Sequence, residues 1–101
     1  MKEATIVVRN EVGLHARPAA MFVQLASKYQ SEILVAKLEG DSDREVNAKS
    51  ILSLLTLGVS QGTAVRIRAT GQDEDEAVSA LRELIDSDFG EADGTGRPAA
   101  D

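Results

Sequence analysis

Segments with two different hydrophobic periods alternate along the chain, and this alternation limits its fold more than any other feature. Residues 4–10 (ATIVVRN) and 63–70 (TAVRIRAT) alternate apolar with polar side chains, as strands with one buried face do. Residues 15–29 (HARPAAMFVQLASKY) instead repeat apolar side chains at helical spacing, as Phe22 and Ala26 illustrate. The sequence therefore predicts a fold that combines strands and helices.

Two more strands and a short helix are expected in the middle of the chain. Residues 31–38 (SEILVAKL) and 44–48 (REVNA) have the composition of strands, and a polar, acidic turn separates them. Ser50 is a good N-cap residue and Gly58 is a good terminating residue. We therefore expect a helix of about two turns between Ser50 and Gly58.

A last helix is expected over residues 73–85 (DEDEAVSALRELI), where Asp73 and Glu76 have the spacing of a capping box. The resulting order, β-α-β-β-α-β-α, predicts an α+β fold in a split βαβ, ferredoxin-like layout with an added last helix. Helices would cover one face of a four-stranded sheet. Arg66 and Arg68 alternate with apolar neighbours, which fits a sheet whose other face is open to water.

Chain length and composition predict a single domain with an aliphatic core. The chain has 101 residues, of which 43% are hydrophobic but only 3% aromatic, and this length suits one small domain. Residues 90–101 carry no hydrophobic period and no bulky apolar side chain. We therefore expect a domain over residues 1–89 and a disordered tail over residues 90–101.

Charge and cysteine content exclude several classes of function. Seventeen acidic and 11 basic residues give a net charge of −6, which argues against a nucleic-acid partner because the phosphate backbone is itself negative. The chain has no cysteine, so thiolate metal sites are excluded, and we expect neither a metal nor a cofactor. No apolar run approaches the roughly 20 residues that span a membrane. We expect a cytoplasmic protein without a membrane partner.

The single histidine of the chain, His15, stands where the first helix is expected to begin. Arg17 and the unpaired N–H groups of the first helical turn would face the same space, which makes a ready binding site for an anion. Pro18 suits a first turn because its missing N–H loses no bond there. One imidazole beside one arginine at a helix start indicates phosphoryl acceptance. The alternative is a surface histidine without a role.

Ser50 allows two interpretations that are compatible with each other. A serine that precedes an apolar helix is most often only its N-cap. A phosphoserine at the same place would also be favourable, because the helix N-terminus stabilises its charge. The second interpretation makes Ser50 a regulatory phosphorylation site.

The helix after Ser50 is apolar around nearly its whole circumference. A helix of two turns at a surface buries only one of its sides. We therefore expect Leu54 and Leu57 to face the core, and Ile51, Leu52 and Leu55 to form an exposed apolar patch. The alternative is that all five side chains belong to the core.

Two motifs, GLHARPAA and AKSILSLLTLGVSQGT, resemble HPr, the histidine-containing phosphocarrier family of the bacterial phosphoenolpyruvate-dependent phosphotransferase system. The resemblance extends from about Lys2 to Leu84, and two motifs in the correct order make it specific. It implies an open-faced β-sandwich, an antiparallel four-stranded sheet covered on one face by three helices. It also implies a stoichiometric phosphoryl carrier in sugar transport, and not an enzyme.

The resemblance further implies roles for the residues around His15. His15 would accept a phosphoryl group on Nδ1 from enzyme I and pass it to a sugar-specific A domain. Arg17 would neutralise the transferring group. Ala16 and Pro18 would shape the start of the helix.

The resemblance also implies a second modified residue and a docking surface. Ser50 matches the position that an ATP-dependent HPr kinase phosphorylates in some lineages, with an effect on a regulator. Ile51, Leu52 and Leu55 match the patch that docks the partners. A carrier of this kind needs that rim free for two partners, so we expect a monomer.

Two departures from the family pattern concern the partners. The turn within LEGDSDREVN, with its acidic run from Glu39 to Glu45, is about four residues longer than in typical relatives. Gln24, Ser27 and Ser53 stand where some relatives carry lysines, so electrostatic steering toward acidic partners should be weaker. The sugar or nitrogen branch that the chain serves stays open.

Two other functions stay open from the sequence. In the first, Ser50 or the surface of Leu52 and Leu55 controls a transcription factor or an enzyme, and His15 has no essential role. In the second, the helix start binds phosphate or sulfate without a covalent product.

Overall fold

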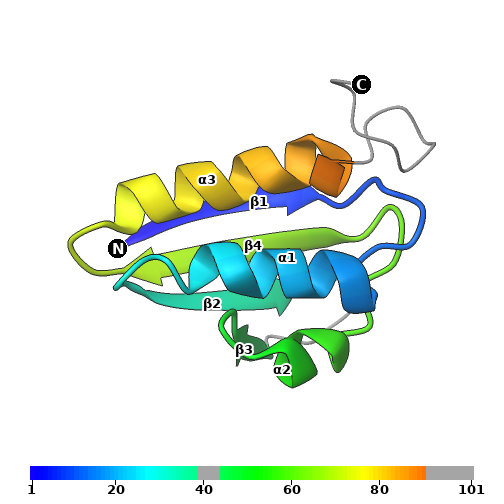
Figure 1. Cartoon of the computed structure of the whole chain (residues 1–101), viewed down its shortest axis with the longest axis horizontal. Coiled ribbons are helices and arrows are strands. Elements are labelled where there is room, and N and C mark those ends of the chain that lie inside the picture. Colours follow the sequence, from blue (N-terminus) through cyan, green and yellow to red (C-terminus); the bar gives the residue numbers. More distant parts are fainter. Residues whose placement is uncertain (39–43, 91–101) are drawn as a thin grey trace.

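The computed structural model describes residues 1–38 and 44–90, and its elements follow the predicted order (Figure 1). They are β1 (Lys2–Val7), α1 (Ala16–Ala26), β2 (Glu32–Lys37), β3 (Glu45–Asn47), α2 (Ile51–Leu55), β4 (Ala64–Thr70), α3 (Glu74–Asp86) and the 3₁₀ turn η1 (Asp88–Gly90). The observed bounds differ from the predicted ones by a few residues. α2 ends early because its last turn tightens, with the N–H of Leu57 donating to the Leu54 carbonyl at 3.1 Å.

The four strands form one antiparallel sheet in the order β1-β4-β2-β3. Because β4 pairs with both β1 and β2, the first two strands run parallel to each other on either side of it, which is the predicted split βαβ arrangement. α1 and α3 lie over the same face of the sheet (Figure 1), and α2 packs against α1 and β3. The predicted open-faced sandwich is confirmed.

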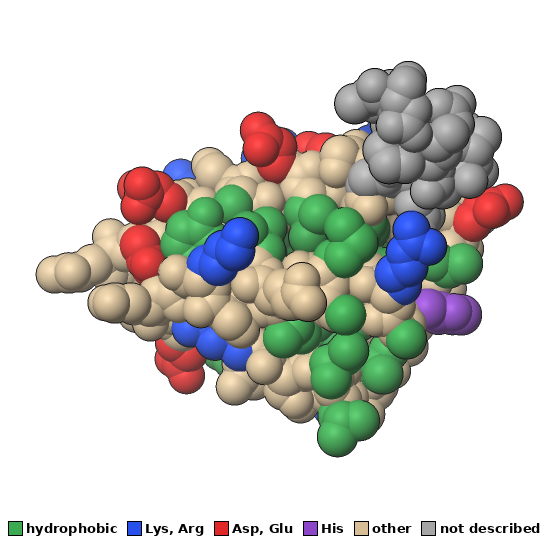
Figure 2. Space-filling view, in the orientation of Figure 1, with side chains coloured by type: hydrophobic (Ala, Val, Ile, Leu, Met, Phe, Trp, Pro, Cys, Tyr) green, Lys and Arg blue, Asp and Glu red, His purple; other side chains and the backbone are tan. Residues whose placement is uncertain are grey.

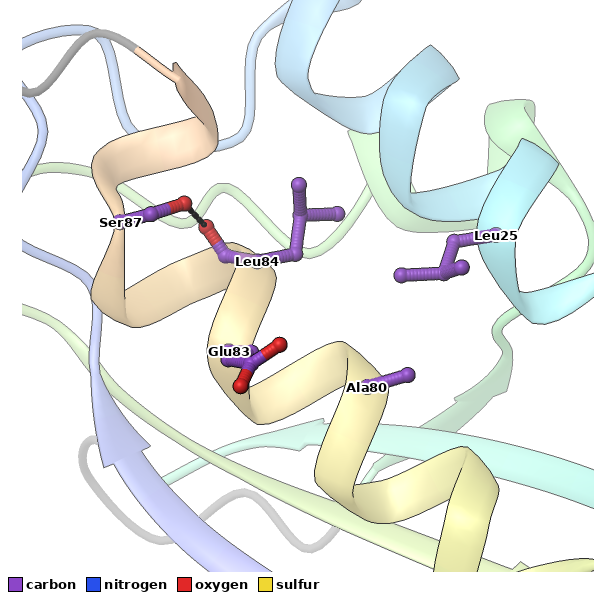
Figure 3. A pocket seen from close by; sticks show the side chains of 5 residues that line it. All are labelled: Leu25, Ala80, Glu83, Leu84 and Ser87. Atoms are coloured by element: carbon purple, nitrogen blue, oxygen red, sulfur yellow. Dashed lines mark hydrogen bonds between the residues drawn. The ribbon is translucent and has the colours of Figure 1, made fainter.

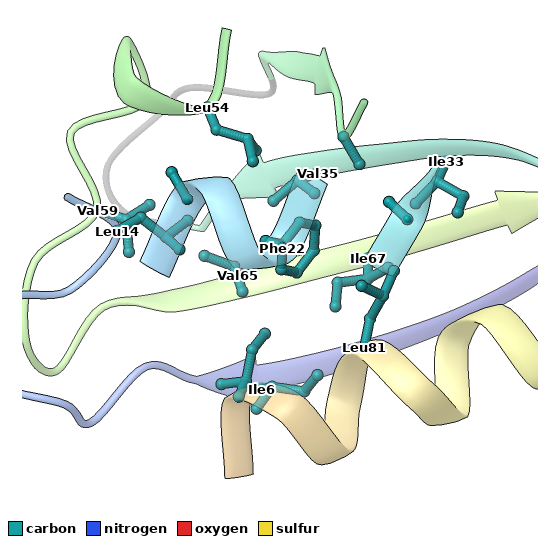
Figure 4. Close-up of a cluster of buried hydrophobic side chains, with 14 of the residues drawn as sticks. Ile6, Leu14, Phe22, Ile33, Val35, Leu54, Val59, Val65, Ile67 and Leu81 are labelled. Atoms are coloured by element: carbon teal, nitrogen blue, oxygen red, sulfur yellow. The ribbon is translucent and has the colours of Figure 1, made fainter. Parts of the chain in front are cut away.

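The core lies between the sheet and the helices, and alternation along the strands decides which side chains enter it. Ile6, Val35 and Ile67, one from each of three strands, are buried on the helix side (Figure 4). Phe22 of α1 is also buried among them. Most of the remaining core side chains are aliphatic, as the low aromatic content predicts.

The opposite face of the sheet carries a charged network. Glu45 on β3 accepts hydrogen bonds from Arg68 at 2.9 Å and from Arg66 at 3.2 Å. Ala36 of β2 lies between Glu45 and Arg66 in the strand register and is fully buried. Burial raises the pKa of Glu45, but the hydrogen bonds from Arg68 and Arg66 outweigh it and leave this pKa below its ordinary value. The arginines of the open face are therefore paired.

The capping box predicted for the last helix, Asp73 with Glu76, is wrong. α3 begins at Glu74, but the Asp73 carboxylate makes no hydrogen bond to the start of this helix. It accepts instead from the backbone N–H groups of Gln30, at 2.8 Å, and Ser31, at 3.0 Å, and from the Ser31 hydroxyl. The turn after α1 supplies these donors, and a pattern within the last helix cannot reveal them.

After α3 the chain reverses, and the side chain of Phe89 returns to the core with 2% of its surface exposed. Asp88 and Phe89 both have a left-handed backbone with φ of 56°, which costs non-glycine residues roughly 1–2 kcal/mol each. Burial of the aromatic ring offsets part of this cost. The predicted tail lies outside the described residues from residue 91 onward, as do residues 39–43 of the long acidic turn.

Candidate functional site

The loop between β1 and α1 leads directly to His15 and contains a closed turn. The N–H of Gly13 donates to the Asn10 carbonyl at 3.1 Å, and the Asn10 side-chain amide donates to the Gly13 carbonyl at 2.9 Å. Gly13 has φ of +58°, and a Cβ added to it would lie 2.4 Å from the carbonyl oxygen of Val59. This position therefore requires glycine both for its conformation and for space.

His15 is the N-cap residue of α1 and has an extended backbone, with φ of −77° and ψ of −173°. Its carbonyl accepts a hydrogen bond from the N–H of Ala19 at 2.8 Å, which is the first bond of the helix. Its side chain forms no capping hydrogen bond and is exposed. The imidazole is thus available to a partner at the positive end of the helix.

The first turn of α1 has the composition of an anion site. It contains no acidic residue, and Arg17 and Ala16 are both exposed. Pro18 is buried in this turn, where its fixed φ suits the helix. Since the first N–H groups of a helix lack partners within it, they and the Arg17 guanidinium favour a negative group beside His15.

α2 begins with the N-cap that the sequence predicts. The hydroxyl oxygen of Ser50 accepts a hydrogen bond from the N–H of Ser53 at 3.3 Å, and its own backbone is extended. The side chain is half-buried. The capping role of Ser50 is confirmed, and its regulatory role stays a prediction.

The side chains of α2 and its last turn divide between the core and the surface. Leu54 and Leu57 are buried, as predicted, whereas Leu52 is 73% exposed and Ile51 and Leu55 are exposed as well. The alternative in which all five belong to the core is therefore wrong. We refer to Ile51, Leu52 and Leu55 as the α2 patch.

His15 and the α2 patch lie at the same end of the molecule. α1 packs against α2, and the N–H of Leu14 donates to the carbonyl of Val59, shortly after α2, at 3.1 Å. Figure 2 shows the histidine at the rim of the molecule, with hydrophobic side chains gathered over α2 nearby. Folding therefore brings the predicted acceptor and the predicted docking residues together.

Basic side chains hold α2 at both of its ends. Before the helix, the Nζ of Lys49 donates to the Tyr29 carbonyl, beyond the end of α1, at 2.7 Å. After the helix, the Arg44 guanidinium donates to the hydroxyl of Thr56 at 2.8 Å. These bonds fix α2 relative to its neighbours and leave one basic side chain near each end of the helix.

A hollow between α1 and α3 lies apart from these residues (Figure 3). It has a volume of about 480 Å³ and is lined by Leu25, Ala80, Glu83, Leu84 and Ser87. Because no predicted site residue lines it, we do not assign it to the candidate site.

Within residues 1–38 and 44–90, no three His, Asp or Glu side chains are grouped as a metal site. No helix of this part has the length and hydrophobicity needed to cross a membrane.

Asn10 and Val59 belong to the support of the site, and neither was predicted from the sequence. Asn at the first position of a turn and Gly at the fourth are typical of a type I β-turn, and Asn10 and Gly13 have this spacing. That signal could have predicted the turn. The contact of the turn with Val59 joins segments far apart in the chain and has no local signal.

Comparisons with known proteins agree with this geometry. A family model described as "PTS HPr component phosphorylation site" matches residues 2–87. Phosphocarrier protein HPr of Xylella fastidiosa is 45% identical over 90% of this chain and 98% of its own length. A multiphosphoryl transfer protein of Haemophilus influenzae is 40% identical over 88% of this chain and 18% of its own length.

Solved structures give the same answer for the fold. The crystal structure of HPr from Thermoanaerobacter tengcongensis is 57% identical in sequence and superposes with a TM-score of 0.83. The match covers 90% of this chain and 98% of that one. A crystal structure of an HPr dimer from the same organism is also 57% identical and has a TM-score of 0.68. This match covers 90% of this chain and the full length of that one.

The fold, the exposed histidine at a helix start and these likenesses define a phosphocarrier, a protein that carries a phosphoryl group and does not act as a catalyst. Such carriers work together with other proteins of a phosphoryl-transfer chain. This chain belongs to the HPr family, the phosphocarriers of the phosphotransferase system.

Proposed function

We propose that His15 is the residue that carries the phosphoryl group, which it takes from phosphorylated enzyme I and passes to a sugar-specific A domain. The bond between phosphorus and enzyme I breaks as a bond to Nδ1 of His15 forms, and the second transfer reverses these roles. The observation that carries the proposal is the free, exposed imidazole at the N-cap of α1.

The neighbours of His15 support this assignment by their charge. Arg17 is exposed in a first turn that has no acidic residue, so its guanidinium can pair with the phosphoryl oxygens during transfer. Ala16 and Pro18 shape the helix start that presents its N–H groups to the same oxygens. The family whose model matches this chain is itself described by a phosphorylation site.

The α2 patch is the proposed docking surface for both partners. Its apolar side chains are exposed beside the rim that carries His15, and an apolar patch on a helix with a basic side chain near each end suits partners with an apolar groove and an acidic rim. Since both partners would need this rim, we propose that the carrier works as a monomer. Light scattering checks this: a mass well above 10.7 kDa at working concentrations would contradict it.

Ser50 is proposed as a regulatory phosphorylation site in addition to its capping role. A phosphate on its hydroxyl would stand at the start of α2, directly before the α2 patch, and would add about two negative charges to the docking surface. Incubation with an HPr kinase and ATP tests this. Label on the wild type that is absent from Ser50→Ala supports the proposal, and equal labelling of both chains would contradict it.

The test of the main proposal is the intact mass of the chain after incubation with phosphoenolpyruvate and enzyme I. We expect one added phosphoryl group on the wild type and none on His15→Ala, and we expect the group to be lost in acid and kept in alkali. Arg17→Ala should still accept the group, but more slowly. Unchanged thermal unfolding of His15→Ala is the control for an intact fold.

Two outcomes would change the assignment. A phosphoryl group on His15→Ala would place the acceptor elsewhere in the chain. No modification of the wild type by an active enzyme I would favour the regulatory function centred on Ser50.

A further inference from the structure

Asn10 is a buried polar residue in the loop that leads to His15. Its side chain is 4% exposed, although asparagine is usually found at the surface. Its amide donates to the Gly13 carbonyl at 2.9 Å, and its own carbonyl accepts from the Gly13 N–H at 3.1 Å. One buried side chain therefore closes the turn immediately before the site.

The other half of the Asn10 side chain is unsatisfied. Among the described residues its Oδ1 has no hydrogen-bond partner, and this atom is shielded from water. A buried acceptor without a partner destabilises the folded state. The stability of the folded state therefore does not by itself explain an asparagine at this position. Within the described part of the chain, its side chain makes one hydrogen bond, the bond to the Gly13 carbonyl.

That bond fixes a single peptide group from one side, and a second bond fixes it from the other. The carbonyl of Gly13 and the N–H of Leu14 belong to the same planar peptide unit. Asn10 holds the oxygen at 2.9 Å, and the carbonyl of Val59 holds the N–H at 3.1 Å. The Gly13–Leu14 peptide is therefore clamped at both ends, and His15 follows it directly.

The clamp also sets where His15 stands relative to the docking surface. Val59 lies in the connection between α2 and β4, so the same peptide links the histidine loop to the segment that follows the α2 patch. Leu14, which is 3% exposed, anchors the loop in the core between these two bonds. A rotation of this peptide would move the His15 imidazole while leaving the α2 patch in place.

We propose that Asn10 is a positioning residue for phosphoryl transfer, which holds the Gly13–Leu14 peptide so that the His15 imidazole faces a docked partner. The inference rests on the proposed function of His15 as the acceptor. Asn10 itself does not touch the phosphoryl group. Its contribution is geometric, and transfer reactions are sensitive to misplacements of about 1 Å.

The experiment compares Asn10→Ala and Asn10→Asp with the wild type in phosphoryl transfer from enzyme I. Asn10→Asp keeps the shape of the side chain but replaces the donor with an acceptor facing the Gly13 carbonyl. Asn10→Ala removes the unpaired Oδ1 together with the donor, so it should still fold. We expect the maximal transfer rate to fall roughly 10- to 100-fold and the KM of enzyme I for this chain to stay unchanged, because the α2 patch is intact.

The matched control is Ser31→Ala at the other end of α1, which removes the hydroxyl bonded to Asp73. It should lower the melting temperature but leave the transfer rate within about twofold of the wild type. Asn10 variants that transfer at the wild-type rate, or that lose no more than Ser31→Ala does, would overturn the inference. So would a raised KM with an unchanged maximal rate.

A second readout separates this inference from the proposed function. Hydrogen exchange of the Leu14 amide, which is bonded to Val59, should become at least about tenfold faster in Asn10→Ala without faster global exchange. This measurement needs no phosphoryl chemistry. If enzyme I fails to modify the wild type, the proposed function of His15 is wrong. Unchanged Leu14 exchange means that Asn10 does not hold the loop.

Discussion

The carboxylate of Asp73 accepts hydrogen bonds from both the backbone N–H of Ser31, at 3.0 Å, and the hydroxyl of the same residue. The pair joins the turn after α1 to the start of α3. The bond from the Ser31 hydroxyl, followed by that from the Gln30 N–H, lowers the pKa of Asp73 below its ordinary value of 3.8. This relationship makes the stability of the domain depend on pH.

We expect Asp73→Asn to be less stable than the wild type at pH 7, with a difference that shrinks in acid. Because the pKa of Asp73 is lower in the folded than in the unfolded chain, its stabilising contribution is complete above the unfolded value. It is lost as the pH falls through the folded value. Melting temperatures of both chains, followed by circular dichroism from pH 7 to pH 3, check this. A difference that stays constant over this range would contradict the assignment.

Gly13→Ala should destabilise the domain more than Gly62→Ala does. Both glycines have positive φ, +58° and +89°, but an added Cβ meets the Val59 backbone at position 13 and nothing within 4 Å at position 62. We expect the free energy of unfolding to fall by at least about 1 kcal/mol more for Gly13→Ala, measured by urea denaturation. Equal losses would mean that the loop moves away from Val59 without cost.

Leu54→Ala and Leu52→Ala should separate folding from docking, although the two residues lie in the same short helix. Leu54 is fully buried, so its truncation should cost about 2–5 kcal/mol of unfolding free energy. Leu52 is 73% exposed, so its truncation should change stability by less than about 0.5 kcal/mol but raise the KM of enzyme I for this chain. A normal KM for Leu52→Ala would remove Leu52 from the proposed docking surface.

Ser50→Ala should cost about 0.5–2 kcal/mol of unfolding free energy, and Ser50→Asp much less, because aspartate also caps helices. The bond that is lost joins the Ser50 hydroxyl to the N–H of Ser53 at 3.3 Å. Ser79→Ala, at an exposed position within α3, is the control and should be neutral or slightly stabilising. Equal destabilisation by alanine and aspartate at position 50 would argue against a capping role.

Removal of residues 90–101 should leave the melting temperature nearly unchanged, because this segment lacks bulky apolar side chains. Phe89→Ala should cost about 3–5 kcal/mol, since this ring is 2% exposed in the core. Thermal unfolding of both variants checks the proposed domain boundary at residue 89. A truncated chain that melts well below the wild type would show that the boundary lies further along the chain.

The sequence by itself determined the features that depend on neighbouring residues. The order of strands and helices, the burial of Leu54 and Leu57, the cap at Ser50 and the helix start at His15 follow from periodicity and from local capping rules. These signals act over a few residues of chain, so they are legible without the fold. The resemblance of two motifs to the HPr family is likewise carried by contiguous residues.

Only the tertiary structure decided which hydrogen-bond and ion-pair partners the polar side chains have. Asp73 has the spacing for a capping box, yet its carboxylate accepts hydrogen bonds from the backbone N–H groups of Gln30 and Ser31 instead. Similarly, only strand pairing brings Glu45 next to Arg66 and Arg68, and only the contact of two loops lets Val59 hold the peptide before His15. The carboxylates and amides in these contacts pair with donors and acceptors that are close in space, and chain folding, not sequence distance, brings those partners close.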